Sequence, residues 1–308
     1  MITSLIWLPA SLTAGLFQAW RTALQQRLRA ELSVSGAGLV RYLYGAPVAV
    51  ALLIAYAKTH EFTAPHLSAM FFVFAAVGGL TQIVGTNLLI AAFSYRNFVV
   101  GTAFSKTEAM QAALFAWLVF GERLGAIVLL GIGLGVVGVL ALSLGGRQLS
   151  VKDLAKAIKQ PAALCGLGAG ALFALTGVFV KRATIEFAQP DAVLSALVTL
   201  AIVMTMQTAM HGTYIAWREP QTLKQAIATW RTSSQVGLFA ALGSACWFIG
   251  FATAPVALVR IVGQIEVVFT LLFARVYLRE HTKRHEIFGL LLVAAGVVLA
   301  LIGSVVTI

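Results

Sequence analysis

The sequence predicts an all-α polytopic membrane protein with ten transmembrane helices, arranged as two inverted five-helix repeats. The first observation is composition: the 308 residues are 60% hydrophobic and 11% charged, whereas a soluble domain carries about 25% charged residues. The second is that apolar runs of about 18 residues or more recur along the chain, and each is long enough to span a bilayer. The third is an internal repeat with a period of half the chain.

The repeat is clearest in Phe98–Gly145, where two apolar runs are joined by the polar break Gly121-Glu122-Arg123. Adding 158 to a residue number leads to the second copy. The matching pairs are Gly85/Gly243, Phe93/Phe251, Glu108/Glu266, Phe115/Phe273, Glu122/Glu280, Gly131/Gly289, Gly138/Gly296 and Gly145/Gly303. This agreement indicates a duplication. We therefore assign residues 1–146 to the first five-helix repeat, 147–160 to an amphipathic basic linker and 161–308 to the second five-helix repeat.

The expected spans are helices, because backbone groups in lipid must be satisfied within the segment. They lie at about 4–26, 34–57, 67–94, 98–120, 124–145, 161–182, 192–216, 234–253, 256–278 and 285–307. An odd number of helices in the first repeat makes the second enter the membrane from the opposite side. Inverted repeats of this kind are an architecture of secondary transporters, with the site near the midplane.

Two further segments, 147–160 and 222–231, place apolar residues on one helical face. This pattern is typical of short helices that lie in the membrane interface, although plain solvated linkers fit the composition equally well. The basic residues gather in odd-numbered loops, which predicts that these loops face the cytoplasm and that both termini face out. The net charge of +11 therefore indicates membrane topology rather than binding to nucleic acid. Cys165 and Cys246 lie inside spans and are expected to be small buried residues.

At this level the sequence resembles the EamA-type branch of the drug/metabolite transporter superfamily. The resemblance rests on Glu108 and Glu266, on the turn residues Gly121-Glu122-Arg123 and Arg279-Glu280, and on the glycine-spaced runs that follow them. Arg41 is similar to an arginine in the family's second helix. The resemblance implies ten helices with an acidic residue in the fourth and the ninth. The family often has proline after each acid, whereas this chain has Ala109 and Val267, which weakens the expectation of a helix break there. The family's usual topology, with both termini cytoplasmic, is opposite to the one that the loop charges predict.

Ionisable residues at membrane depth are costly and are therefore functional candidates. Lys106 and Glu108 are two residues apart, about 200° around the fourth helix, and therefore cannot both face one cavity squarely. The residues expected to bind substrate or line the cavity are Gln18, Arg21, Arg41, Gln82, Thr86, Asn87, Lys106, Trp247, Arg260 and Gln264. Glu108 and Glu266 are the candidates for proton coupling. The alternative for these two glutamates is a buried structural ion pair with Arg41 or Arg21.

The sequence thus favours a secondary transporter, an exporter or exchanger, for a small metabolite such as an amino acid or organic anion. Alternating access around a central cavity is the expected mechanism. The alternatives are a passive channel-like pore and a non-transporting membrane partner subunit. Metalloprotease, nucleophile-elbow and P-loop motifs are absent from the sequence, so we expect neither an enzyme nor a primary ATP-driven pump. No cofactor or metal site is expected. The expected partners are the substrate, the lipid bilayer of the inner cell membrane and a coupling proton, with a monomer as the working unit.

Overall fold

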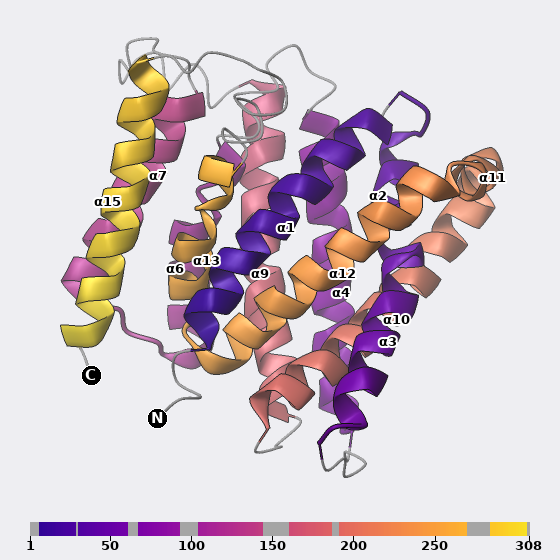
Figure 1. Ribbon diagram of the computed structural model, residues 1–308, viewed down its shortest axis with the longest axis horizontal. Coiled ribbons are helices and arrows are strands. Elements are labelled where there is room, and N and C mark those ends of the chain that lie inside the picture. The colour runs from indigo at the N-terminus through magenta and orange to yellow at the C-terminus, as the bar shows by residue number, and fades with distance from the viewer. Residues whose placement is uncertain are drawn as a thin grey trace. The chain divides into compact units, whose positions relative to one another are not determined.

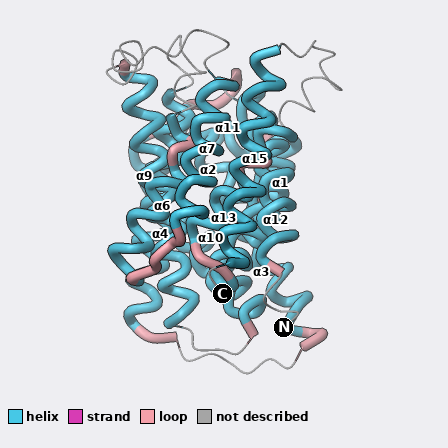
Figure 2. The backbone as a smooth tube through the Cα atoms, turned by 90° about the vertical axis from the view of Figure 1, so that its left-hand side faces the viewer, coloured by secondary structure: helices cyan, strands magenta, loops and turns pink. Residues whose placement is uncertain are grey.

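The computed structural model describes residues 6–28, 30–60, 67–92, 104–143, 160–186, 191–269 and 284–306. Within these ranges every regular element is a helix (Figures 1 and 2). The helices are α1 (Trp7–Leu28), α2 (Val34–Leu43), α3 (Gly45–Ala57), α4 (Ala69–Ala92), α6 (Glu108–Phe120), α7 (Ala126–Ser143), α9 (Pro161–Glu186), α10 (Ala192–Arg218), α11 (Pro220–Ala228), α12 (Trp230–Thr253), α13 (Val256–Gly263) and α15 (Arg284–Val306).

Length and composition mark five described segments as able to cross a membrane: Val34–Ala57, Ala69–Ala92, Pro161–Glu186, Ala192–Arg218 and Trp230–Thr253. The shorter apolar helices are Glu108–Phe120, Ala126–Ala141 and Leu291–Gly303. All of them lie within the spans that the sequence predicts, apart from small extensions at their ends. The full count of ten stays a prediction, because parts of the expected fourth and ninth spans lie outside the described residues. The linker 147–159 lies outside them as well.

The duplication is visible in the helix boundaries. α2, which begins at Val34, and α10, which begins at Ala192, form a first pair at the 158-residue offset, and α7 and α15 are a second pair of counterparts in the repeat. The preceding side chains cap the first pair in the same way: Ser33 Oγ accepts from the backbone N–H of Gly36, and the Asp191 carboxylate accepts from Val193 and Leu194. Both residue types satisfy N–H groups that a helix start leaves unpaired.

The chain forms two compact units, and neither coincides with a sequence repeat. Unit 1 comprises residues 1–83 and 176–254, and unit 2 comprises 84–175 and 255–308. Each unit therefore takes helices from both repeats, and α4 and α9 each contribute one part to each unit. In unit 1, α1 packs along α12, while α10 packs against α2, α3 and α12. In unit 2, α7 packs along α15 and α13 packs against α6.

The expected span 34–57 is interrupted at Tyr44, between α2 and α3. Pro47 explains the interruption, because it has no N–H for the Leu43 carbonyl and its ring crowds that carbonyl. The expected short helix 222–231 is present as α11, which favours the helical alternative over a plain linker there. It begins at Pro220 and ends at Ala228, whereas Trp230 already belongs to α12.

Glycines bring α7 and α15 into close antiparallel contact. A Cβ added at Gly131 would lie 2.6 Å from the Ala300 nitrogen, and one added at Gly138 would lie 2.6 Å from the Val293 nitrogen. Real Cβ atoms essentially never approach so closely, so the two backbones can pack this tightly only without side chains at these positions. The repeated glycines at these positions therefore allow close helix packing. Gly121 has a different role, because it ends α6 in the left-handed conformation (φ 67°) that glycine adopts readily.

Candidate functional site

The site in unit 2 is built on two helix interruptions that repeat one another. In the first, the N–H of Thr107 bonds to Phe104 O, while those of Met110 and Gln111 bond to Thr107 O. In the second, the N–H of Ile265 bonds to Val262 O, while those of Val268 and Phe269 bond to Ile265 O. The three bonds correspond one to one at the 158-residue offset. Two of each three span only three residues, which indicates a tight turn within a helix.

The break that the missing prolines argued against is therefore present in both copies, and it lies before each glutamate instead of after it. Glu108 is the first residue of α6, and helical structure resumes at Glu266 in the second copy. The first turn of a helix carries unpaired N–H groups and a partial positive charge, so it favours a carboxylate. The tight turns also change backbone pairing: Lys106 O accepts from Gln264 Nε2 at 3.0 Å. Lys106 and Gln264 are themselves counterparts in the repeat.

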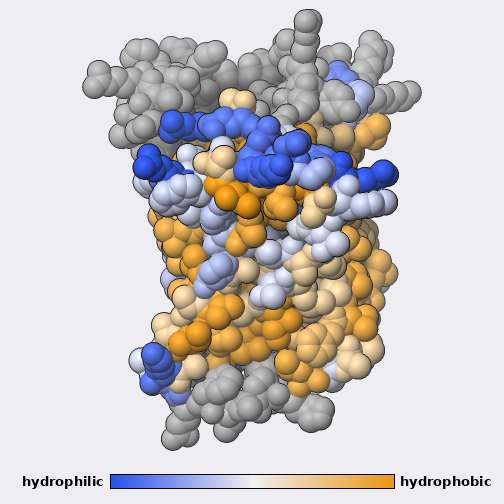
Figure 3. Space-filling view, turned by 90° about the vertical axis from the view of Figure 1, so that its right-hand side faces the viewer, coloured by the Kyte–Doolittle hydropathy of each residue, from blue (hydrophilic) through white to orange (hydrophobic). Residues whose placement is uncertain are grey.

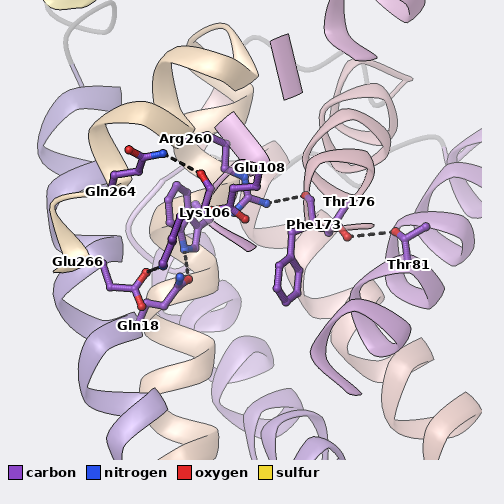
Figure 4. Close-up of polar contacts among 10 residues, drawn as sticks. Gln18, Thr81, Lys106, Glu108, Phe173, Thr176, Arg260, Gln264 and Glu266 are labelled. Carbon is purple, nitrogen blue, oxygen red and sulfur yellow. Dashed lines mark hydrogen bonds and ion pairs between the residues drawn. The ribbon is translucent and has the colours of Figure 1, made fainter. Parts of the chain in front are cut away.

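Both glutamates form buried ion pairs (Figure 4). Lys106 Nζ donates to Glu266 Oε2 at 2.5 Å, and the two side chains are 12% and 9% exposed. Arg260 Nη1 lies 3.6 Å from Glu108 Oε2, with exposures of 7% and 8%. Each pair joins an acid of one repeat to a cation of the other. The four side chains together carry no net charge.

Arg260 has a further anchor in the same unit. Its Nη2 donates to the backbone carbonyl of Phe173 in α9 at 2.8 Å. The arginine of α13 thus connects the α6 carboxylate to α9. Gly170, one turn earlier in α9, leaves room for this approach, since a Cβ there would lie 2.9 Å from Ser105 O. The interruption is consequently packed from two sides, by α13 and by α9.

The prediction that Lys106 and Glu108 cannot both face one cavity squarely rests on a premise that is wrong. It assumed a regular helix of 100° per residue, and the turn at Lys106 and Thr107 ends that regularity. Both side chains instead form ion pairs with the segment 260–266. In both described ion pairs the partner of the glutamate is a cation other than Arg41 and Arg21, which the sequence suggested as partners.

The remaining predicted residues of unit 2 are Thr86 and Asn87 in the second part of α4. Thr86 is buried. The Asn87 Oδ1 atom is buried without a hydrogen-bond partner in the described structure, as is Gln264 Oε1. A buried acceptor in this state costs roughly 1–3 kcal/mol unless water or a ligand meets it. Both amides therefore retain unused capacity to accept a hydrogen bond.

The other predicted residues belong to unit 1. Gln18 Oε1 accepts from Trp247 Nε1 at 3.0 Å, which fixes the indole of α12 against α1. Arg41 Nη2 lies 3.4 Å from Ser244 Oγ, and its guanidinium lies 5.5 Å from the centre of the Tyr42 ring. Arg21, like Arg41, is buried. The predicted set thus falls into two groups, one in each unit.

Gln82 belongs to a polar cluster of unit 1 that the sequence analysis only partly identified. Gln207 Nε2 donates to Gln82 Oε1 at 2.8 Å and to Gly79 O at 3.1 Å. Tyr42 Oη donates to Gln82 O at 3.3 Å. His211 is only 3% exposed, and its ring centre lies 6.1 Å from that of Tyr42. A glutamine within the apolar run of α10 was the signal that could have identified Gln207.

Among the described residues, no group of three or more His, Cys, Asp and Glu side chains is gathered as metal ligands would be. What the two interruptions hold in place are ion pairs and amides. Such a set can bind a polar or charged molecule. It offers no described nucleophile activated by a neighbouring base.

Comparison with known proteins gives a family and a fold. The model of the EamA-like transporter family matches residues 5–144 and 160–302. A comparison with curated proteins gives no match. Among 29 matching chains of solved structures, one described only as "Crystal structure of protein" aligns with a TM-score of 0.70. It is 17% identical, and the alignment covers 98% of both chains, so this likeness concerns the fold alone.

Proposed function

Because the chain belongs to the EamA-like transporter family, we propose that it is a secondary transporter of a small metabolite and works by alternating access. We further propose that the substrate is an amino acid or an organic anion. The observation that carries the mechanism is the pair of interrupted helices, each of which presents a glutamate directly after its turn. Interrupted helices supply the substrate and ion sites of many secondary transporters, since backbone polar groups become available there.

The packing of α7 and α15 supports inverted repeats. The two helices are counterparts in the duplication, and they run antiparallel in contact. A Cβ at Gly131 would lie 2.7 Å from Gly296 O, and one at Gly138 would lie 2.9 Å from Gly289 O. Replacing each residue by its counterpart exchanges these two contacts. A two-fold axis perpendicular to both helices produces this exchange, and for membrane-spanning helices such an axis lies in the membrane plane.

The ion pairs are suited to open and close during a transport cycle. Lys106–Glu266 and Arg260–Glu108 both connect one repeat to the other, so a movement between repeats separates them. A separated buried charge is costly. A proton on the glutamate, or an anionic group of the substrate on the cation, offsets that cost. Proton binding, substrate binding and movement are coupled in this way.

The interior charge favours an anionic group on the substrate. Unit 1 buries two cationic side chains, Arg21 and Arg41. Unit 2 supplies Lys106 and Arg260, which become available when their pairs open. A guanidinium binds a carboxylate through two parallel hydrogen bonds. We place the protein in the inner cell membrane as a working monomer, exporting or exchanging its substrate.

Reconstitution into liposomes tests the proposal. A proton-coupled transporter accumulates labelled substrate against its gradient when a pH gradient is imposed, whereas a passive pore only equilibrates it. Amino acids and organic anions should compete with the label, and quaternary ammonium compounds should not. Competition by the cations alone, with Lys106→Ala leaving binding unchanged, would refute the anionic substrate. Equilibration without accumulation under every gradient would instead favour the pore.

The coupling role is tested by Glu108→Gln and Glu266→Gln, which preserve shape and remove the titratable group. We expect each change to reduce the pH dependence of transport, and the double change to abolish it. The matched control is Glu186→Gln, because Glu186 pairs with Arg182 at 3.1 Å in a partly exposed ion pair, with side chains 25% and 41% exposed. Unchanged transport and pH dependence in the double variant would exclude both glutamates from coupling.

A further inference from the structure

The segment 217–231, which we call the corner segment, connects α10 to α12 through α11 and lies entirely in unit 1. Hydrogen bonds hold the side of the corner segment that packs against α2 and α3, which we call its inner side. The Glu219 carboxylate accepts hydrogen bonds from Ser33 Oγ at 2.8 Å and from Thr222 Oγ1 at 3.0 Å. Tyr44 Oη donates to Ala226 O at 3.1 Å. These contacts join α11 to α2 and α3, so the corner segment is a defined surface.

The outer side of the corner segment is apolar and aromatic. Trp217 is 73% exposed, Ile227 59% and Trp230 55%. Tryptophan is enriched where a protein meets the membrane–water interface, because its ring is apolar and its N–H is polar. On the face turned toward the viewer in Figure 3, hydrophilic residues gather in a band above a hydrophobic area. An exposed aromatic face at such a boundary fits the region between lipid headgroups and acyl chains.

Three cations accompany this aromatic face. Arg218, Lys224 and Arg231 are all exposed. The Arg218 guanidinium lies 4.6 Å from the centre of the Trp217 ring, and that of Arg231 lies 5.7 Å from the Trp230 ring. The corner segment contains one acidic residue, Glu219, and the hydroxyls of Ser33 and Thr222 already occupy its carboxylate. The outer side therefore presents positive charge beside apolar rings.

We propose that the corner segment binds the headgroup of an anionic phospholipid. A phosphate diester matches the guanidinium hydrogen-bond donors, and the stacked rings hold those guanidinium groups close to the apolar surface. Trp217, Ile227 and Trp230 contact the glycerol and the start of the acyl chains. Charge selects the headgroup, and the rings restrict the ligand to a lipid. Because the inner side is fixed to α2 and α3, lipid occupancy also stabilises unit 1.

The test uses the purified full-length chain in detergent, titrated with short-chain phosphatidylglycerol or phosphatidylcholine while thermal unfolding is followed. We expect phosphatidylglycerol to bind more tightly. Replacing Arg218 and Arg231 by glutamine should weaken its binding about 25-fold, since each interfacial cation contributes a factor of about five. The matched control is Lys58→Gln with Arg123→Gln, which removes two exposed cations elsewhere and should leave binding unchanged.

Three results would overturn the proposal: equal binding of both lipids, equal weakening in the control variant, or competition by glycerol phosphate, which has no acyl chains. If the glutamine variant does not fold, Arg218→Lys with Arg231→Lys keeps the charge but loses the guanidinium donors, so it should bind more weakly than the wild type and still prefer phosphatidylglycerol. The salt dependence of lipid binding to the wild-type protein is an independent test. Raising salt from about 0.1 to about 1 M should remove the preference for phosphatidylglycerol, and a preference that persists in high salt would contradict charge recognition.

Discussion

Alanine in place of Gly131 should destabilise the protein, because the added methyl group meets backbone atoms of α15. It would lie 2.6 Å from the Ala300 nitrogen and 2.7 Å from Gly296 O, whereas real Cβ atoms essentially never come within 3.0 Å of such atoms. The two helices must therefore separate by about 0.4 Å or more. Overpacking of this kind typically costs about 1–3 kcal/mol.

Gly133 provides the control in the same helix. A Cβ there meets nothing within 4 Å, so Gly133→Ala carries the same chemical change without the clash. Alanine favours the helical conformation over glycine by up to about 1 kcal/mol, and this variant should be as stable as the wild type or more stable. The two single-methyl variants should consequently move in opposite directions.

Thermal unfolding of the purified protein in one detergent measures both variants. At roughly 2 °C or more per kcal/mol for a chain of this size, we expect Gly131→Ala to lower the midpoint by several degrees. Gly296→Ala should behave similarly, since its Cβ would lie 2.5 Å from the Gly135 nitrogen. Equal midpoints for the Gly131 and Gly133 variants would refute the close contact between α7 and α15.

Three further predictions concern charge, conformation and topology. Lys106→Met should destabilise the protein by about 3–5 kcal/mol because it leaves Glu266 charged and buried, and adding Glu266→Leu should recover most of that loss. Thermal unfolding measures both variants, and a double variant no more stable than the single one would contradict this prediction. Gly121→Ala should lower the stability by about 1–2 kcal/mol, because the φ of 67° at this position disfavours residues with a side chain. Gly121→Asn should lower it less, and the reverse order in the same assay would argue against a left-handed helix end. Cysteines at Ser150 and Thr307 should react with impermeant reagents from the cytoplasm and from outside, respectively, since basic residues mark the cytoplasmic loops; reaction of Ser150→Cys from outside would reverse the topology.

The helices could be predicted from the sequence because their signals are local. The start of α2 after Ser33 and the end of α6 at Gly121 follow from residue types that favour caps and left-handed turns. The duplication added the correspondence between α7 and α15. These features depend on spacing along the chain, which the sequence shows directly.

The interruptions at Lys106 and Gln264 could not be predicted, because neither turn contains a proline and only the second contains a glycine, Gly263. They are held by tertiary contacts such as the Gln264–Lys106 hydrogen bond, whose partners are far apart in sequence. The same holds for the ion pairs. Glu108 and Lys106 were identified as buried ionisable residues, but their partners depend on a turn that periodicity had treated as regular helix. The interruption at Tyr44 is a different case. Pro47 signals it in the sequence, but the expected span 34–57 was treated as one continuous helix.

The exchange of helices between the repeats has a consequence for synthesis. Unit 1 needs residues 1–83 together with 176–254, so the first repeat cannot complete it alone. At about 5–20 residues per second, the early helices wait roughly 10–30 s in the membrane before their partners leave the ribosome. Cutting the chain in the linker 147–160 would therefore give two fragments that must associate to become stable. Co-expression of both fragments should therefore give a stable protein that neither fragment forms alone.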